Sequence, residues 1–245
     1  RIEAMEYFNP VAMINEREST TVNDNFGGNA RVTLNIKPVK GLKWDAFLAI
    51  SRESNESQTY SSHYYPSIIG TEGSAEQSNY KNNNTQFETT LQYIRSFGEH
   101  SLQALVGYTY EKGTENSASM SNVGFDFDDL GVNDMGSGTG LLNAKASMDS
   151  YKESHTYIGF FGRILYNYDQ RYLASVSLRR DGSSRFGKNN KWGWFPAVSL
   201  GWRISREAFM RDIEWLNELK IRGGYGVTGN QDFSNYKSLI LMTTA

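Results

Sequence analysis

The residues best suited to acid–base or metal chemistry are scattered along this chain of 245 residues. His63, His100 and His155 are its three histidines, and they lie too far apart in the sequence to suggest a ligand set or a catalytic triad. The chain has no cysteine, so it can form neither a disulfide nor a thiolate metal site. No pair of carboxylates stands out as a glycosidase pair. The sequence therefore predicts no catalytic residue, no metal site and no cofactor, and it gives an enzyme no positive support.

An acidic run, FDFDDLGVND at 125–134, comes closest to a metal-binding motif. Four of its residues match positions of an EF-hand calcium loop, but Leu130 and Ser137 occupy positions where that loop needs ligands. We interpret the run as a solvated acidic loop, with a calcium site shared with another loop as the alternative. Its acidic residues are Asp126, Asp128, Asp129 and Asp134.

Aromatic side chains in polar segments are suited to stacking against sugar rings. Three tyrosines are grouped in one Ser- and Asn-rich segment, and two further aromatic residues lie towards the C-terminus. Ordinary loop composition is the competing interpretation. The predicted substrate-binding residues are Tyr60, Tyr64, Tyr65, Trp192 and Tyr236.

The elements that must position these residues are strands, because apolar and polar residues alternate strictly in many short stretches. Polar segments at 1–25, 53–83 and 112–155 are predicted to be loops. Apolar residues at helical spacing predict a short amphipathic helix at 205–218. The predicted strands are 31–37, 43–51, 85–97, 102–110, 156–168, 172–180, 194–204 and 219–227.

The connections between these strands alternate between short turns and long loops. A strand of about ten residues, rising about 3.3 Å per residue and tilted near 40°, covers about 25 Å, which is the height of an outer-membrane apolar band. Short turns on one side and long loops on the other are typical of an outer-membrane barrel, with the short turns in the periplasm. The sequence therefore predicts an all-β, antiparallel transmembrane barrel segment with short periplasmic turns and long extracellular loops.

Composition agrees with a barrel although hydropathy does not reveal one. Hydrophobic residues make up 38% of the chain, its mean hydropathy is −0.57, and no apolar run approaches the roughly 18 residues of a membrane helix. Apolar and polar residues alternate along a barrel strand, so a search for long apolar runs does not detect it. Aromatic residues make up 13% and gather at strand ends, which favours interfacial girdles over cross-strand packing in a soluble sheet. The predicted girdles are Trp44, Tyr93, Tyr166, Tyr168, Tyr172 and Trp202 near the short turns, and Phe87, Tyr108, Tyr110 and Tyr225 near the long loops.

The opposite face of the predicted strands is basic. A closed barrel of about eight strands fills its interior with side chains, so unpaired cations there would be costly. In a wider barrel, water, an anionic ligand or a plug domain compensates the charge, and we therefore expect an arc of a larger barrel. The predicted inward residues are Arg31, Lys37, Lys43, Arg163, Arg179, Arg203, Lys220 and Arg222, against Asp45 and Glu88.

Three motifs carry a family resemblance: YLASVSLRRDGSSRFG at 172–187, WGWFPAVSLGWRISREAF at 192–209 and LKIRGGYGVTGNQ at 219–231. In order and spacing they resemble the late barrel strands of SusC/RagA-type TonB-dependent outer-membrane transporters of Bacteroidota, over about a quarter of the chain. We expect a structural role for the motif loop, with a tight Asp-Gly turn and Arg185 pairing with Asp181 or a neighbouring loop. The motif residues are Asp181, Gly182, Ser183, Ser184, Arg185, Phe186, Gly187, Gly229, Asn230 and Gln231.

The resemblance implies the C-terminal part of a barrel of about 22 strands, with residues 1–245 as a partial barrel domain and the plug and other strands outside them. It also implies import of oligosaccharides or peptides across the outer membrane, a SusD-like surface lipoprotein, TonB acting through the plug, and a lipid bilayer around the wall. No Lys/Arg block suggests nucleic acid, and the net charge is −2. The alternatives are a passive porin, a structural or adhesin barrel, and a soluble carbohydrate-binding β-domain.

Overall fold

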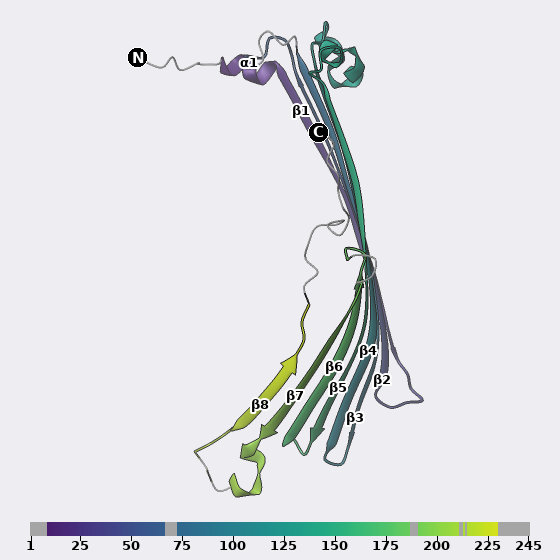
Figure 1. Cartoon of the computed structure of the whole chain (residues 1–245), viewed down its shortest axis with the longest axis vertical. Helices are drawn as coiled ribbons and strands as arrows, with labels where there is room; N and C mark the ends of the chain where they lie inside the picture. Colours follow the sequence, from purple (N-terminus) through teal and green to yellow (C-terminus); the bar gives the residue numbers. More distant parts are fainter. Residues whose placement is uncertain (1–8, 67–72, 187–190, 211–212, 214, 230–245) are drawn as a thin grey trace. The chain divides into compact units, whose positions relative to one another are not determined.

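The computed structural model of this chain describes residues 9–66, 73–186, 191–210, 213 and 215–229. Eight strands lie side by side in chain order in one antiparallel sheet (Figure 1). This confirms the predicted fold class. The strands are β1 (Arg17–Asn35), β2 (Leu42–Ser61), β3 (Ser74–Phe97), β4 (His100–Val123), β5 (Ser147–Tyr168), β6 (Tyr172–Ser183), β7 (Trp192–Arg203) and β8 (Lys220–Gly226).

The chain forms two compact units, and the long strands β1 to β5 contribute to both. Unit 1 holds a small core in which Tyr60, Ala75 and Phe125 are buried. Unit 2 holds the short turns and the whole of β6, β7 and β8. Unit 1 comprises Arg1–Gly27, Ser51–Asn83 and Thr114–Glu153, and unit 2 comprises Gly28–Ile50, Asn84–Gly113 and Ser154–Ala245.

The short turns of unit 2 are the ones that the sequence predicts. Asp169 and Gln170 have φ angles of 49° and 54°, as the two central residues of a type I′ hairpin require. Gly41 has a φ of 89°, and its carbonyl accepts a hydrogen bond of 2.8 Å from the Ile94 amide of β3. A Cβ at this position would overlap the Ile94 carbonyl. The glycine therefore lets the first turn pack against the third strand.

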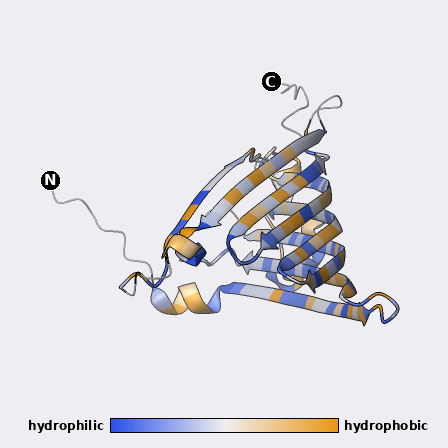
Figure 2. Ribbon diagram, turned by 90° about the horizontal axis from the view of Figure 1, so that it is seen from below, coloured by the Kyte–Doolittle hydropathy of each residue, from blue (hydrophilic) through white to orange (hydrophobic). Residues whose placement is uncertain are grey.

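Unit 2 has one apolar face and one polar face, and the register of the strands shows which residues share each. Val176 pairs with Ile164 on β5 and with Val198 on β7, and Val198 pairs with Tyr225 on β8. Orange and blue bands alternate along the strands in Figure 2. The exposed apolar side chains of these strands include Phe160, Ile164, Val176, Leu178, Val198, Leu200 and Ile221. Because this face has no covering layer in the described chain, it fits contact with lipid.

Aromatic rings form two rows on the apolar face. Near the short turns, Tyr168 stacks on Tyr172 with ring centroids 6.3 Å apart, and Tyr172 pairs with Trp202. The second row runs through Phe87, Tyr108, Phe160 and Trp192, with successive centroids 6.3, 5.1 and 6.2 Å apart. Trp202 follows Trp192 by ten residues of strand, which is about 25 Å of height at the usual tilt. Tyr225 pairs with Val198 near the middle of β7, so its predicted place in the second girdle is wrong.

The strands are longer than predicted, and much of the predicted loops is strand. β3 and β4 have 24 residues each, which is about 80 Å of extended chain. The extensions pair through polar side chains, as in the Ser19–Thr59 bond of 3.0 Å and the Asn79–Glu56 bond of 2.9 Å. Outside lipid, neither face of a strand needs to be apolar. The alternation of apolar and polar residues therefore ends while the strand continues. Residues 53–61, 74–83, 112–123 and 147–155 are corrected from loop to strand.

Two other local predictions are also wrong. Residues 1–25 contain a helix, α1 (Pro10–Asn15), and the start of β1, rather than a loop alone. Asn9 caps α1 by accepting a 3.1 Å bond from the Val11 amide, and Pro10 occupies the first helical turn. The predicted helix at 205–218 contains only the 3₁₀ turns η4 (Ile204–Arg206) and η5 (Ala208–Met210) among its described residues. In the described parts of the chain, no helix is long and apolar enough to cross a membrane.

Glu207, between η4 and η5, ties the short-turn end of unit 2 together. Its Oε1 accepts hydrogen bonds of 2.9 Å from Trp202 Nε1 and 2.8 Å from Tyr172 Oη. Its Oε2 lies 3.2 Å from Nη1 of Arg171, whose Nε pairs with Asp169 at 2.7 Å. These hydrogen bonds from Trp202 and Tyr172, with the charge of Arg171, lower the pKa of Glu207.

Substitution of the apolar face tests its contact with lipid. We expect Val198→Lys in the complete outer-membrane protein to destabilise the folded barrel by about 2–4 kcal/mol, because the charge would lie midway between the aromatic rows. Ser199→Lys, one residue along on the polar face, is the matched control and should cost much less. Thermal unfolding in bilayers measures both. Equal losses in the two variants would contradict the assignment of the faces.

The lowered pKa of Glu207 predicts a pH dependence of stability. Ionised Glu207 stabilises the folded state above its ordinary pKa of 4.5, and this contribution is lost as the pH falls through the lower pKa of the folded state. Glu207→Gln should therefore lower the melting temperature at pH 7 and reduce the loss of stability between about pH 5 and pH 3. Melting curves across this range provide the measurement. Parallel profiles for the wild type and the variant would refute the role of the carboxylate.

Candidate functional site

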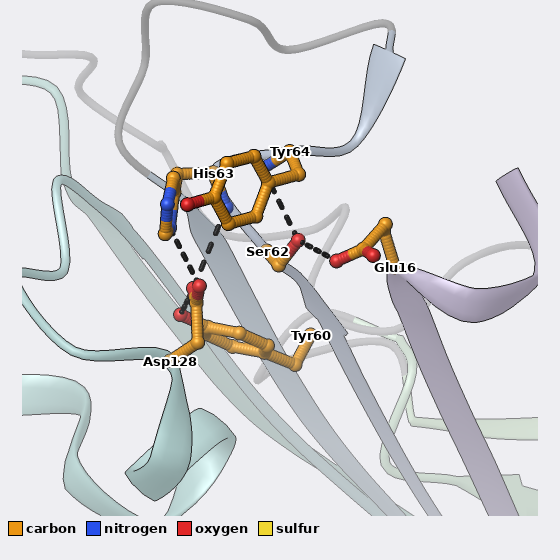
Figure 3. A network of polar contacts seen from close by, with 6 residues as sticks. All are labelled: Glu16, Tyr60, Ser62, His63, Tyr64 and Asp128. Atoms are coloured by element: carbon orange, nitrogen blue, oxygen red, sulfur yellow. Dashed lines mark hydrogen bonds and ion pairs between the residues drawn. The ribbon is translucent and has the colours of Figure 1, made fainter. Parts of the chain in front are cut away.

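Unit 1 contains the three tyrosines predicted to bind substrate, and Figure 3 shows two of them, Tyr60 and Tyr64. Tyr60 and Tyr65 are buried, at 8% and 7% exposure, while Tyr64 is 65% exposed. Tyr60 packs edge-on against Phe125, with ring centroids 5.7 Å apart. Of the three, Tyr64 therefore presents the accessible ring.

The Asp128 side chain links the 3₁₀ helix η2 (Asp128–Ser137) to the end of β2. Its Oδ1 accepts a 2.7 Å hydrogen bond from Tyr60 Oη, and its Oδ2 lies 2.5 Å from Nδ1 of His63 (Figure 3). Tyr60 stands about 60 Å along β2 from its first residue, well beyond a 25 Å apolar band. Burial, followed by the hydrogen bond to Asp128 and its charge, raises the pKa of the Tyr60 hydroxyl, which stays protonated as a donor.

The exposed side of this cluster is formed by the rings of Tyr64 and His63. The Tyr64 ring lies 3.8 Å from the His63 ring, and the Tyr64 amide donates a 3.2 Å bond to Ser62 Oγ (Figure 3). Ser62 Oγ in turn donates a 2.5 Å bond to Glu16 Oε2, just before β1. Because the Tyr64 backbone is held by its hydrogen bond to Ser62, the exposed ring is able to stack on a ligand without a large loss of conformational entropy.

The acidic run at 125–134 does not assemble a metal site in the described residues. No group of three or more His, Asp or Glu side chains there is close enough to hold an ion. Asp128 is engaged by Tyr60 and His63, and the other acidic residues of the run are exposed. His63 has a carboxylate partner that the sequence did not reveal, since Asp128 lies 65 residues away in the sequence but in direct contact.

In unit 2 the three sequence motifs converge on one cavity of about 510 Å³. Strand register places most of its β6 and β7 lining on the polar face of these strands, and the predicted site residue Trp192, at the start of β7, also borders the cavity. The first motif supplies Asp181, Ser183 and Phe186, the second Gly193 and Phe195, and the third Gly229. The described motif residues Gly182, Ser184 and Arg185 lie beside it. Gly187, Asn230 and Gln231, like Tyr236, lie outside the described residues.

Aromatic rings packed on glycines explain why these motifs carry glycine. The Phe195 ring lies over Gly193 and Gly229, where a Cβ would overlap it. On the apolar face, a Cβ at Gly182 would come within 2.8 Å of the Trp192 ring. Trp192 thus belongs to the second aromatic row, with the Arg180 guanidinium 4.7 Å from its ring centroid. It lies in unit 2, whereas the three predicted tyrosines lie in unit 1.

Arg179 and Asp181 form the charged pair of the cavity. Arg179 Nε donates to both carboxylate oxygens of Asp181, at 2.7 and 2.8 Å, and its Nη2 donates to the Tyr157 hydroxyl. Asp181 and Gly182 are paired residues of β6 rather than the start of a tight turn, which corrects the prediction. Asp181 pairs with Arg179, two residues earlier, because alternate strand residues share a face.

The polar face is less uniformly basic than predicted. Arg31 lies 3.4 Å from Asp45, and Arg203 lies 3.3 Å from Glu218, in addition to the Arg179–Asp181 pair. In the described part of the chain, Arg163, Lys220 and Arg222 have no carboxylate within ion-pair distance. They line a second, smaller hollow of about 310 Å³ near the short turns.

Comparison with known proteins decides the family. The family model described as TonB dependent receptor-like, beta-barrel matches residues 7–239. This chain belongs to the TonB-dependent receptor family. As a member of that family it is an outer-membrane β-barrel segment, and the apolar face of unit 2 is the face towards lipid.

Relatives of this TonB-dependent receptor chain come from Bacteroidota. The chain is 29% identical to TonB-dependent receptor P3 of Formosa agariphila over 94% of its length, and 28% identical to TonB-dependent receptor SusC of Bacteroides thetaiotaomicron over 93%. A solved structure of the RagAB peptide transporter matches 90% of the chain with a TM-score of 0.77 and 26% identity. The chain spans 22% of the length of each curated relative and 24% of that structure.

The hydrogen bond from Tyr60 to Asp128 predicts how firmly η2 is held. Tyr60→Phe removes a buried donor to a carboxylate, so local opening of 128–137 should become easier by about 1.5–3 kcal/mol. Amide hydrogen exchange of that segment should then be at least about tenfold faster. Tyr64→Phe, which alters an exposed hydroxyl on the same strand end, should leave exchange unchanged. Equal exchange in the two variants would show that the bond does not hold the segment.

Proposed function

We propose that this chain is part of the barrel wall of an active importer that carries oligosaccharides or peptides across the outer membrane. The observation that supports it is the two-faced sheet of unit 2, apolar towards lipid and polar on the side that a lumen would take. Family membership adds that the wall is of the TonB-dependent type.

The wall needs more protein to be complete. β1 and β8 are the edge strands of the described sheet, and an unpaired edge is not tolerated in the hydrocarbon of a bilayer. We therefore place these strands in a wider barrel, of about 22 strands in this architecture, whose lumen is plugged. In this proposal, the plug supplies acidic groups opposite Arg163, Lys220 and Arg222, which lack carboxylate partners in the described chain.

The energy source and the partner follow from the same assignment. TonB pulls on the plug after cargo has bound, and the wall stays largely rigid while the plug rearranges. A SusD-like surface lipoprotein covers the extracellular side and delivers cargo, with Tyr64 as an accessible contact on unit 1. The likeness to SusC and to the RagAB peptide transporter supports this arrangement.

Uptake in cells tests the proposal against a passive porin and an adhesin. Cells carrying the complete gene should take up labelled oligosaccharide or peptide only when TonB is present and the inner membrane is energised. Deletion of the gene, or of TonB, should abolish uptake to the same extent. Uptake that persists without TonB would identify a porin, and a gene deletion without effect on any uptake would favour a structural barrel.

A further inference from the structure

The cavity in which the three motifs converge has no assigned role. Its position on the polar face of β6 and β7 keeps it away from lipid, and its volume of about 510 Å³ falls in the range of small-molecule sites. It combines two phenylalanine rings, Phe186 and Phe195, with the Arg179–Asp181 pair and the hydroxyl residues Ser177 and Thr228. Aromatic walls with a few convergent polar groups are the usual composition of such sites.

Glycines on both sides of Asp181 leave room for the side chains that line the cavity. Asp181 pairs in register with Gly159 on β5 and with Gly193 on β7. A Cβ at Gly159 would come within 2.9 Å of Asp181 Oδ1 and 3.1 Å of Arg179 Nη2, and the Phe195 ring occupies the space above Gly193. The charged pair and this ring are therefore walls of the cavity, which we call the recess. The pair is accessible in part, since its side chains are 41% exposed for Arg179 and 21% for Asp181.

The charge of the recess selects a neutral ligand. The guanidinium and the carboxylate compensate each other, so the pair attracts neither anions nor cations strongly. Side by side they present N–H donors and acceptor lone pairs, which match adjacent hydroxyl groups that both donate and accept. The Phe195 ring, whose outer end occupies the space above Gly193 and Gly229, lines the cavity and offers an aromatic surface to the C–H side of a sugar ring.

We propose that this recess is a subsite for one or two neutral sugar units of an oligosaccharide passing along the wall. Asp181 and Arg179 bind a vicinal pair of hydroxyls, and Phe195 stacks on the ring. The assignment rests on the proposed function and narrows its cargo to saccharides, and it turns motif residues that shape the wall into residues that contact cargo.

The test uses the complete protein purified from outer membranes. A panel of neutral hexose and pentose oligosaccharides, with neutral peptides of equal length, identifies what the wild type binds by calorimetry. Asp181→Asn keeps the shape of the side chain but removes the charge pair, and Phe195→Leu removes the stacking face. Arg203→Gln, which alters a cation on the same face outside the recess, is the matched control. The heat-dependent shift in gel mobility confirms that each barrel is folded.

We expect the wild type to bind an oligosaccharide, and Asp181→Asn and Phe195→Leu to weaken that binding at least about tenfold, with the control unchanged. If Asp181→Asn does not fold, Phe195→Leu decides the result alone. Equal oligosaccharide affinity in all proteins, or no oligosaccharide binding by the wild type, overturns the inference. Peptide binding that these variants weaken instead would assign the recess to a polypeptide and also overturn it.

The same proteins separate this inference from the proposed function. TonB-dependent uptake that is equal in the wild type, Asp181→Asn and Phe195→Leu would remove the subsite and leave the importer standing. Loss of all TonB dependence in the wild type would remove the importer itself.

Discussion

The pairing register of the strands is the constraint on which the rest of unit 2 depends. Side chains alternate between faces with a period of two, so a shift of one residue would exchange the lipid face for the polar face along the whole strand. The pairing of Val176 with Ile164 and with Val198 also fixes the pairing of Asp181 with Gly159 and Gly193. One set of backbone hydrogen bonds therefore places both the apolar surface and the recess.

The membrane-spanning part of each strand was predictable because one face meets an apolar surrounding and the other a polar one, so apolar and polar residues alternate along it. Val32 to Asn35, Leu102 to Tyr110 and Trp194 to Trp202 all alternate, and all are strand. The extensions carry no such pattern, because Ser, Thr and Asn suit either face of a strand in water. Their pairing depends on contacts such as Thr21 with Ser57, which join residues 36 apart and leave no local signal.

The sites were less predictable than the strands, because they too are formed by residues that lie far apart in the sequence. The three motifs are recognisable in the sequence, but only the structure shows that Arg179 pairs with Asp181 and that residues of all three motifs line one cavity. Tyr60, Tyr64 and Tyr65 are neighbours in sequence, yet their burial differs widely because Phe125 and Asp128 cover Tyr60. Alternation within 177–183 was the one local signal that would have placed Asp181 on the same face as Arg179.

Aromatic rings that occupy the space above glycines also shape the polar face of this wall. The end of the Phe195 ring occupies the space that a Cβ at Gly193 or Gly229 would take, so a larger residue at either position would push the ring away. The same holds for Phe161, which lies on Gly107. The missing methyl groups let these rings lie closer to the strands, so the shape of the polar face depends on its glycines as much as on its large side chains.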